Sequence, residues 1–150
     1  MSTYYALLLP QHVRLKIQEI RKALYVASGH KSFRSLESCI LLGRTEDTTL
    51  SKKVSCPRLP LAVQDRATFA SDTLFFPVEE KELTQIRTEL GVTHPYSGIY
   101  LGDINWEYEG DFPIPPLKNL RLALVEIQSD KTIMLWRTLA EKRLQKDRAI

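Results

Sequence analysis

The sequence contains the same pattern twice, and this internal repeat constrains the fold more than any other feature. Leu7–Pro10 resembles Leu74–Pro77, because in each copy large apolar residues lead directly to a proline. Each segment is followed by apolar residues at helical spacing, which predicts a helix with one buried stripe. The matched stripe positions are Ile17, Ile20, Arg21 and Leu24 in the first copy, and Leu83, Ile86, Arg87 and Leu90 in the second.

The two copies continue to match beyond the helices. Ser38–Gly43 and Ser97–Gly102 both consist of a serine, a short run that is mostly apolar, and a glycine, which predicts a buried strand in each copy. A proline-rich segment follows each strand, at 57–61 and at 113–117. Two copies are too few for a solenoid. The repeat therefore predicts an α+β fold of two pseudo-symmetric β-α-β lobes with a central cleft.

The expected organisation is a single domain built around the two copies. It covers 1–150, with the copies at 4–70 and 71–130 and a C-terminal strand or helix at 131–150. The predicted strands are 4–9, 36–42, 68–78, 99–101, 104–108 and 117–127, and the predicted helices are 11–25 and 79–90. Gly102 and Asp103 suit a two-residue hairpin turn between 99–101 and 104–108. The segment 132–136 is a last strand or the start of a terminal helix, because its apolar spacing fits both.

The composition argues against several classes of protein. The apolar share of 43% and the charged share of 26% are those of an ordinary globular chain. No apolar run approaches the ~20 residues that a membrane span needs, and the N-terminal segment lacks the basic start of a signal peptide. Cys39 and Cys56 do not form a metal-type C-x-x-C pair, and no glycine-rich phosphate loop occurs. We therefore expect a cytoplasmic chain with no metal and no cofactor.

The net charge of +3 is too small to identify a dedicated DNA-binding protein. Basic residues gather in two places, the segment 44–58 and the C-terminal tail. The tail contains Arg137, Lys142, Arg143, Lys146 and Arg148. Two interpretations remain open: solvated surfaces, or a surface for phosphates or nucleic acid.

The layout resembles that of the 2H phosphoesterases, the superfamily of RNA 2′,3′-cyclic phosphodiesterases and RNA ligase-like enzymes. Tyr4–Pro10 resembles the first strand of that family and the proline before its first helix, and Leu41–Gly43 resembles the end of its first motif strand. Leu74–Phe76 resembles the central strand that precedes the second helix, and 120–136 resembles the closing strand pair. The resemblance covers nearly the whole chain and implies this fold.

The family carries one His-x-Thr/Ser motif in each lobe, so the resemblance also implies a site. The two histidines serve as general base and general acid on a phosphodiester, because imidazole titrates near neutrality. In this sequence the hydroxyl positions are Ser38 and Ser97, whereas Leu36 and Pro95 occupy the histidine positions. Neither of these side chains can transfer a proton, so we expect a pseudoenzyme. His94 is the one histidine that a small register slip brings toward the cleft.

Three functions follow as hypotheses. The first is a binding module for a phosphate-bearing ligand, such as a nucleotide, a cyclic nucleotide or an RNA end, with Ser38 and Ser97 holding the phosphate. Tyr96 and Tyr100 would stack a base. The other expected ligand contacts are His94, Arg34, Arg44 and Arg121. The second hypothesis is a phosphodiesterase with rearranged catalytic groups, and the third is a scaffold that binds protein partners through its proline-rich loops and basic tail. The matched serines favour the first.

Overall fold

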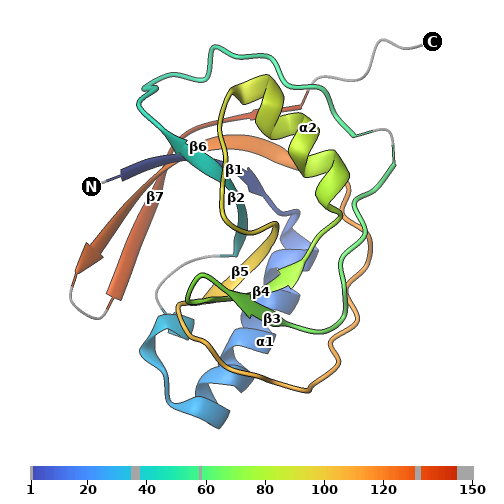
Figure 1. Ribbon diagram of the computed structural model, residues 1–150, viewed down its shortest axis with the longest axis vertical. Helices are drawn as coiled ribbons and strands as arrows, with labels where there is room; N and C mark the ends of the chain where they lie inside the picture. Colours follow the sequence, from blue (N-terminus) through green and yellow to red (C-terminus); the bar gives the residue numbers. More distant parts are fainter. Residues whose placement is uncertain (1, 35–37, 58, 131–132, 145–150) are drawn as a thin grey trace.

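The computed structural model describes residues 2–34, 38–57, 59–130 and 133–144. Figure 1 shows the helices and strands along the chain. The strands are β1 (Ser2–Leu8), β2 (Cys39–Thr45), β3 (Thr68–Ala70), β4 (Thr73–Pro77), β5 (Gly98–Gly102), β6 (Arg121–Asp130) and β7 (Ile133–Arg143). The helices are α1 (Gln11–Ser28) and α2 (Glu80–Leu90), with a short 3-10 turn, η1 (Lys31–Arg34), after α1.

The strands form one 7-stranded antiparallel sheet in the order β3-β4-β5-β2-β1-β6-β7. The central part of this order, β4-β5-β2-β1, places the units β1-α1-β2 and β4-α2-β5 in equivalent positions on either side of the β2–β5 contact. At that contact Ile40 pairs with Ile99, and these two isoleucines occupy the same position in the two copies of the repeat. Antiparallel pairing of equivalent residues is what a pseudo-twofold axis between the copies requires.

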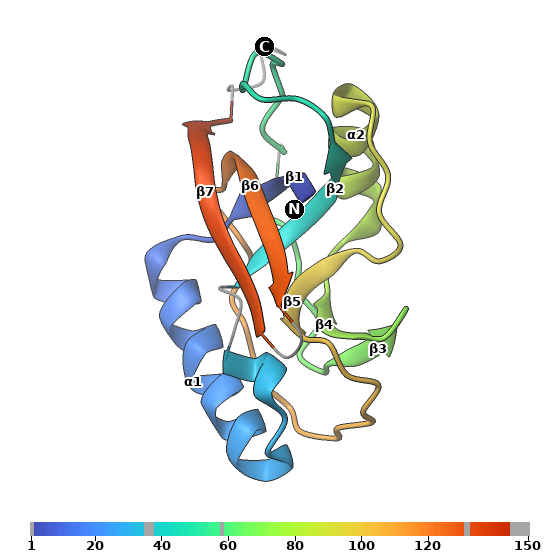
Figure 2. The same ribbon diagram turned by 90° about the vertical axis from the view of Figure 1, so that its left-hand side faces the viewer.

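Both helices bury the stripe that the repeat predicts. The buried residues of α1 are Val13, Ile17, Ile20, Arg21 and Leu24, and those of α2 are Leu83, Ile86, Arg87 and Leu90. The two helices lie on opposite sides of the molecule in Figure 2, yet their apolar side chains belong to one continuous core. No helix in the described part of the chain has the length and apolarity that crossing a membrane requires.

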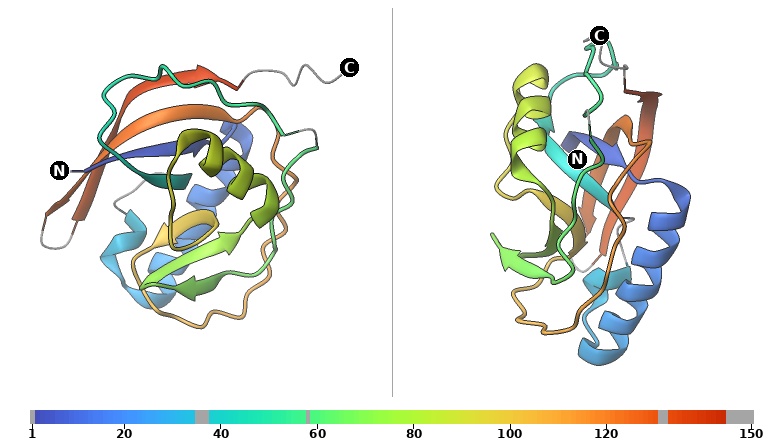
Figure 3. Two further views of the ribbon diagram at one scale, coloured as in Figure 1. Left: turned by 45° about the horizontal axis from the view of Figure 1, so that its top comes forward. Right: turned by 90° about the vertical axis from the view of Figure 1, so that its right-hand side faces the viewer.

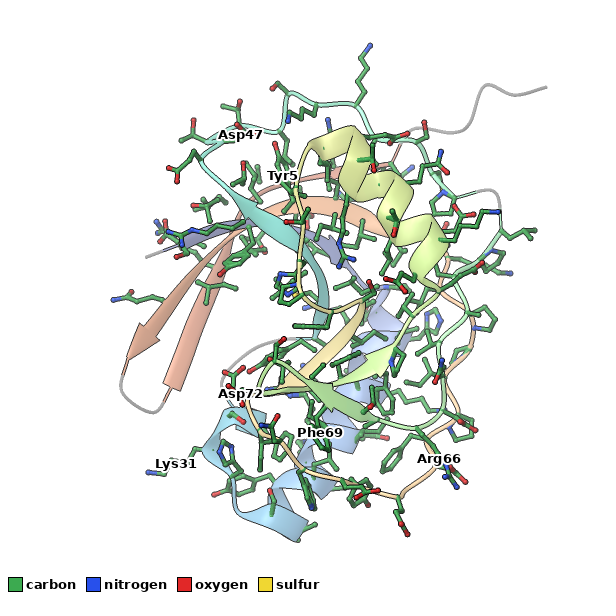
Figure 4. The ribbon with its side chains drawn as sticks, viewed as in Figure 1. Tyr5, Lys31, Asp47, Arg66, Phe69 and Asp72 are labelled. Atoms are coloured by element: carbon green, nitrogen blue, oxygen red, sulfur yellow. The ribbon has the colours of Figure 1, made fainter. Side chains whose placement is uncertain are left out.

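The long segment between β2 and β3 is held against the rest of the chain by its polar groups. Lys52 Nζ donates to the carbonyl of Leu90 at the end of α2 over 2.6 Å, and Lys142 Nζ donates to the carbonyl of Leu50 over 3.2 Å. Figure 3 shows this segment passing both α2 and β7. Near its start Asp47 accepts a hydrogen bond from the hydroxyl of Tyr5, the two residues labelled at the top of Figure 4. Two of the clustered basic side chains therefore satisfy backbone carbonyls.

The predicted hairpin with a second strand at 104–108 is wrong. β5 already pairs with β4 on one side and with β2 on the other, so no free edge remains for a strand that folds back onto it. Residues 104–110 have no regular structure. Ile104, Trp106 and Tyr108 are partly buried against the main core, so their alternation with polar residues reflects packing without a hydrogen-bonded ladder.

The predicted strand at 68–78 is a hairpin of two strands. Ser71 and Asp72 have φ angles of 52° and 61°, the left-handed conformation that a tight two-residue turn between antiparallel strands needs. Figure 4 labels Asp72 at this turn and Phe69 on β3. Two other predicted strands differ from the structure only in their bounds. The strand predicted at 117–127 is β6, and the strand predicted at 36–42 is β2. The terminal segment 133–143 is a strand, so its helical alternative is wrong.

Candidate functional site

Ser38 and Ser97 stand at equivalent positions, each directly before a central strand. Ile40 and Ile99 form the antiparallel pair at the centre of the sheet, and each follows its serine by two residues. Antiparallel strands carry the two serines to diagonal positions, four residue steps apart, which corresponds to about 13 Å along the strands. The pairing therefore gives each serine its own surroundings instead of bringing both to one phosphate.

A cavity of about 550 Å³ adjoins Ser97. Its walls come from the N-terminal part of α2, from the hairpin β3–β4, from 62–64 and from 94–97. Three of the predicted site residues, His94, Tyr96 and Ser97, line it, together with Arg87 of α2. Ser38, Arg44 and Arg121 are not among its lining residues. The structure thus assembles the second copy's part of the predicted site.

Arg87 is the main polar group behind this cavity, although its side chain is only 8% exposed. Nε donates to the carbonyl of Leu42 over 2.9 Å, and Nη2 donates to the carbonyls of Leu41 and Tyr96 over 3.0 and 2.9 Å. Nη1 donates to Ser97 Oγ over 2.6 Å. The guanidinium therefore connects α2 to β2 and to the segment that carries the site. Burial lowers the pKa of Arg87, and the charge of Glu80 opposes that shift.

These bonds leave one donor of Arg87 and one of Ser97 without an acceptor among the described residues. A guanidinium has five N–H groups, and four of those of Arg87 have partners. The remaining one, on Nη1 beside Ser97, has no acceptor among the described residues. Because Ser97 Oγ accepts from Arg87, the hydroxyl proton of Ser97 can be donated elsewhere. Two oriented donors, one of them cationic, thus lie side by side at the cavity wall.

His94 lies at the boundary between the two copies. Its ring packs edge-on against Tyr4 of β1, with centroids 6.2 Å apart, and against Tyr96, with centroids 4.6 Å apart. Burial, and then the positive charge of Arg87, lowers the pKa of His94 to about 4. The imidazole is therefore neutral near pH 7. Its Nε2 atom is buried and has no hydrogen-bond partner in the described part of the chain.

The folded chain should lose stability as the pH falls, because His94 is harder to protonate when folded than when unfolded. The unfolded chain takes up the proton near pH 6.5, whereas the folded chain does so near pH 4, so acidification between these values favours unfolding. Because the ring is partly exposed, we expect roughly 1.5 kcal/mol of destabilisation from it, about half of what the full shift implies. Urea denaturation at pH 7 and pH 4 measures the change in the free energy of unfolding. His94→Gln should reduce this change.

The expectation that Tyr96 and Tyr100 stack a base is not compatible with their surroundings. Tyr96 is 7% exposed and stacks on Phe75 with centroids 4.6 Å apart and an interplanar angle of 27°. Tyr100 is 2% exposed, and its hydroxyl bonds to Asp103. Burial raises the pKa of both phenols well above the usual value. Neither ring offers an open face to a ligand, because both rings are packed inside the protein.

The remaining predicted residues belong to the first copy or lie beside it. Arg34 is the last residue of η1, and its side chain lies outside the described part of the chain. Arg44 is exposed near the end of β2, opposite Tyr4 of β1. Arg121 begins β6 and lies 3.4 Å from Glu141 of β7. Neither Arg44 nor Arg121 is among the residues that line the cavity.

Unpaired buried polar atoms coincide with the predicted site residues. In the described chain the buried side-chain atoms without a hydrogen-bond partner are Ser38 Oγ, His94 Nε2, Tyr96 Oη and Arg121 Nε. Such atoms are uncommon in folded proteins and require an explanation. Every one of them belongs to a residue that the sequence predicts as part of the site. Two of the four, those of His94 and Tyr96, belong to residues that line the cavity, whereas Ser38 and Arg121 do not line it.

Two features of the site bear on chemistry. His12 is exposed on α1 and His30 Nδ1 lies 2.7 Å from Ser32 Oγ, so neither joins His94 at the cavity. Among the described residues no three His, Cys, Asp or Glu side chains gather to hold a metal ion.

Arg87 was not among the predicted ligand contacts. Its signal in the sequence was a charged residue inside an apolar helical stripe, at the same place in both copies.

No protein-family model matches the sequence, and no curated protein matches it either. Solved structures do match. TT0787 of Thermus thermophilus superposes with a TM-score of 0.65 at 12% identity, over 98% of this chain and 100% of that one. E. coli LigT in complex with 3′-AMP gives 0.61 at 16% identity, over 95% and 96%. A protein described as a phosphoesterase gives 0.55 at 13% identity, over 95% and 98%.

These similarities extend over nearly the whole of each chain, so they concern the complete arrangement of strands and helices. The shared architecture is an antiparallel sheet with few helices, built here from two equivalent β-α-β units. The sequence identities are low, and the likeness accordingly describes the fold. The chain has the α+β fold of the 2H phosphoesterases.

Proposed function

We propose that this chain binds the phosphate group of a small ligand in the cavity beside Ser97. The proposal depends on two donors at the cavity wall that are left without an acceptor, one N–H of Arg87 and the proton of Ser97. A buried polar group without a partner costs about 1–3 kcal/mol. A phosphate group offers several oxygens to such donors, and its charge complements the buried guanidinium.

The structural relatives support a ligand of this class. E. coli LigT has been solved with 3′-AMP, with phosphate, with ATP and with NADP+. Each of these molecules carries at least one phosphate group. Because the present chain has the same fold, a phosphate-bearing small molecule is the ligand class that we propose for it.

We propose further that binding here proceeds without the two-histidine reaction. That reaction needs one imidazole to remove a proton and a second to supply one. Pro95 stands at one of the two positions and lines the cavity, and His94 is the imidazole that remains beside it. A lone neutral histidine with a pKa of about 4 is a weak base at pH 7.

We expect no hydrolysis of a 2′,3′-cyclic nucleotide by the purified chain. The measurement is release of the 2′- or 3′-monophosphate, followed by chromatography over several hours. Turnover that disappears in His94→Gln would show that the catalytic groups are rearranged, and would overturn this part of the proposal. Turnover that survives in that variant would indicate a contaminating enzyme.

Ser97→Ala tests the binding site directly. The substitution removes one donor to a charged oxygen, which corresponds to about 1.5–3 kcal/mol, so affinity for 3′-AMP and for inorganic phosphate should fall by roughly 10- to 100-fold. Isothermal titration calorimetry gives the two dissociation constants. Thermal denaturation of the variant shows whether its fold is intact, which we expect because Ala removes only the hydroxyl.

Ser38→Ala is the matched control, because Ser38 holds the equivalent position in the other copy. We expect it to bind phosphate as the natural chain does. Equal losses in both variants would place the phosphate between the copies and overturn the assignment to the Ser97 cavity. Absence of binding by every phosphate compound tested would overturn the proposal as a whole.

A further inference from the structure

We propose that the cavity recognises a single phosphate group and offers no free aromatic face to a nucleobase. The inference rests on the proposed function and specifies its ligand class: a monophosphate whose remaining part projects outward. It depends on three features of the cavity wall, namely occupied aromatic rings, closely spaced donors and acidic residues on α2.

The aromatic rings of the wall are already used by the protein. Phe75 and Tyr96 are 6% and 7% exposed, they stack on each other, and Tyr96 also contacts the ring of His94. Recognition of bases by proteins commonly uses an open aromatic face. Most of the remaining wall is aliphatic, with Gln64 and Thr68 as its uncharged polar residues. A base entering the cavity would therefore find no free platform.

The donors of the wall are close enough to serve one phosphate. Arg87 Nη1 and Ser97 Oγ are 2.6 Å apart, so the free N–H of the first and the free proton of the second can reach oxygens of the same group. The guanidinium is largely buried and carries no ion-pair partner among the described residues. The strongest attraction for an anion thus concentrates at one point of the cavity.

Acidic residues limit the size of the anion. Glu79 and Glu80 line the cavity at the start of α2, and both are exposed. Glu80 precedes Arg87 by two helical turns on the same face, about 10 Å along the helix axis. A second or third phosphate extending from Arg87 toward this end would approach two carboxylates, which repel it. A monophosphate avoids that repulsion.

Calorimetric titration of the full chain tests both parts of the proposal. The ligands are inorganic phosphate, ribose 5-phosphate, 3′-AMP, 3′-CMP and ATP. We expect the dissociation constants of the first four to agree within about threefold, because the bases of 3′-AMP and 3′-CMP find no aromatic face. ATP should bind at least about tenfold more weakly. The double variant Glu79→Gln/Glu80→Gln should improve ATP binding severalfold, and more than it improves the binding of phosphate.

Glu82→Gln is the matched control, since Glu82 lies in the same first turn of α2 but not among the cavity's lining residues. It should leave ATP binding as it is. Binding of 3′-AMP tenfold or more above ribose 5-phosphate would show base recognition and overturn this inference while the proposed function stood. ATP affinity that equals that of phosphate, with no response to the double variant, would overturn the role of the carboxylates. No binding of any of these compounds would overturn the proposed function, and the inference with it.

Discussion

Replacing Arg87 with methionine is expected to abolish phosphate binding and to lower the free energy of unfolding by about 3–5 kcal/mol. Methionine fills much of the same space but donates nothing to the carbonyls of Leu41, Leu42 and Tyr96. Each of these carbonyls would lose the hydrogen bond from Arg87, and the loss of a bond to a charged group costs about 1.5–3 kcal/mol. The variant also leaves Ser97 without the bond that orients its hydroxyl. Urea denaturation and phosphate titration measure the two effects separately.

Arg21→Met is the matched control, because Arg21 of α1 bonds to a strand of the second copy, just as Arg87 of α2 bonds to a strand of the first. Its Nε donates to the carbonyl of Leu101 over 3.0 Å, the residue of β5 that corresponds to Leu42 of β2 in the repeat. We expect a comparable loss of stability with phosphate binding retained. A substitution at 87 that destabilises the chain but leaves affinity intact would refute the role of this arginine in the site.

Arg87→Lys keeps the test informative if the methionine variant does not fold. A lysine retains the positive charge but cannot reach several acceptors with a fixed planar fork. We expect intermediate stability and phosphate affinity reduced about tenfold, because the Ser97 hydroxyl loses its orientation. Unchanged affinity would mean that charge alone suffices and that the bond to Ser97 does not position it.

The internal repeat allowed most of the architecture to be predicted. It located both helices and identified their buried stripes residue by residue, because a helical stripe depends on local spacing. Strand neighbours depend on contacts between distant segments, and local pattern does not contain them. The prediction of a strand at 104–108 failed for that reason: its alternation was real, but both edges of β5 were already occupied.

The candidate site was predictable only where it is continuous in sequence. His94, Tyr96 and Ser97 lie within four residues and line the cavity together. Arg44 and Arg121 are predicted from their charge alone, and neither lines the cavity. Arg87 was overlooked as a ligand contact because a buried arginine is indistinguishable in sequence from an exposed one. Its equivalence to a second arginine in the repeat was the one available indication.

Gly98→Ala should be the most damaging single-methyl substitution near the site. Gly98 begins β5 directly after Ser97, and it pairs with Pro77 of β4. An added Cβ would lie 2.3 Å from the carbonyl oxygen of Phe76 and 2.5 Å from Cδ2 of Phe75. Both distances are far inside van der Waals contact, and the nearer atom is backbone. We expect the free energy of unfolding to fall by about 3 kcal/mol or more, as overpacking of a rigid region does.

The cause of that loss can be isolated with Gly29→Ala as the control. A Cβ at Gly29 meets no atom within 4 Å, and its cost comes from the left-handed φ of 71° at the end of α1, about 1–2 kcal/mol. The clash at Gly98 instead forces β4 and β5 apart. This shift also displaces the backbone of Ser97, whose carbonyl accepts a hydrogen bond from the N–H of Val78 over 3.1 Å. Phosphate affinity should therefore fall in Gly98→Ala and stay constant in Gly29→Ala. Equal stability losses and equal affinities in the two variants would contradict the close approach of β4 and β5 on which the geometry of the site depends.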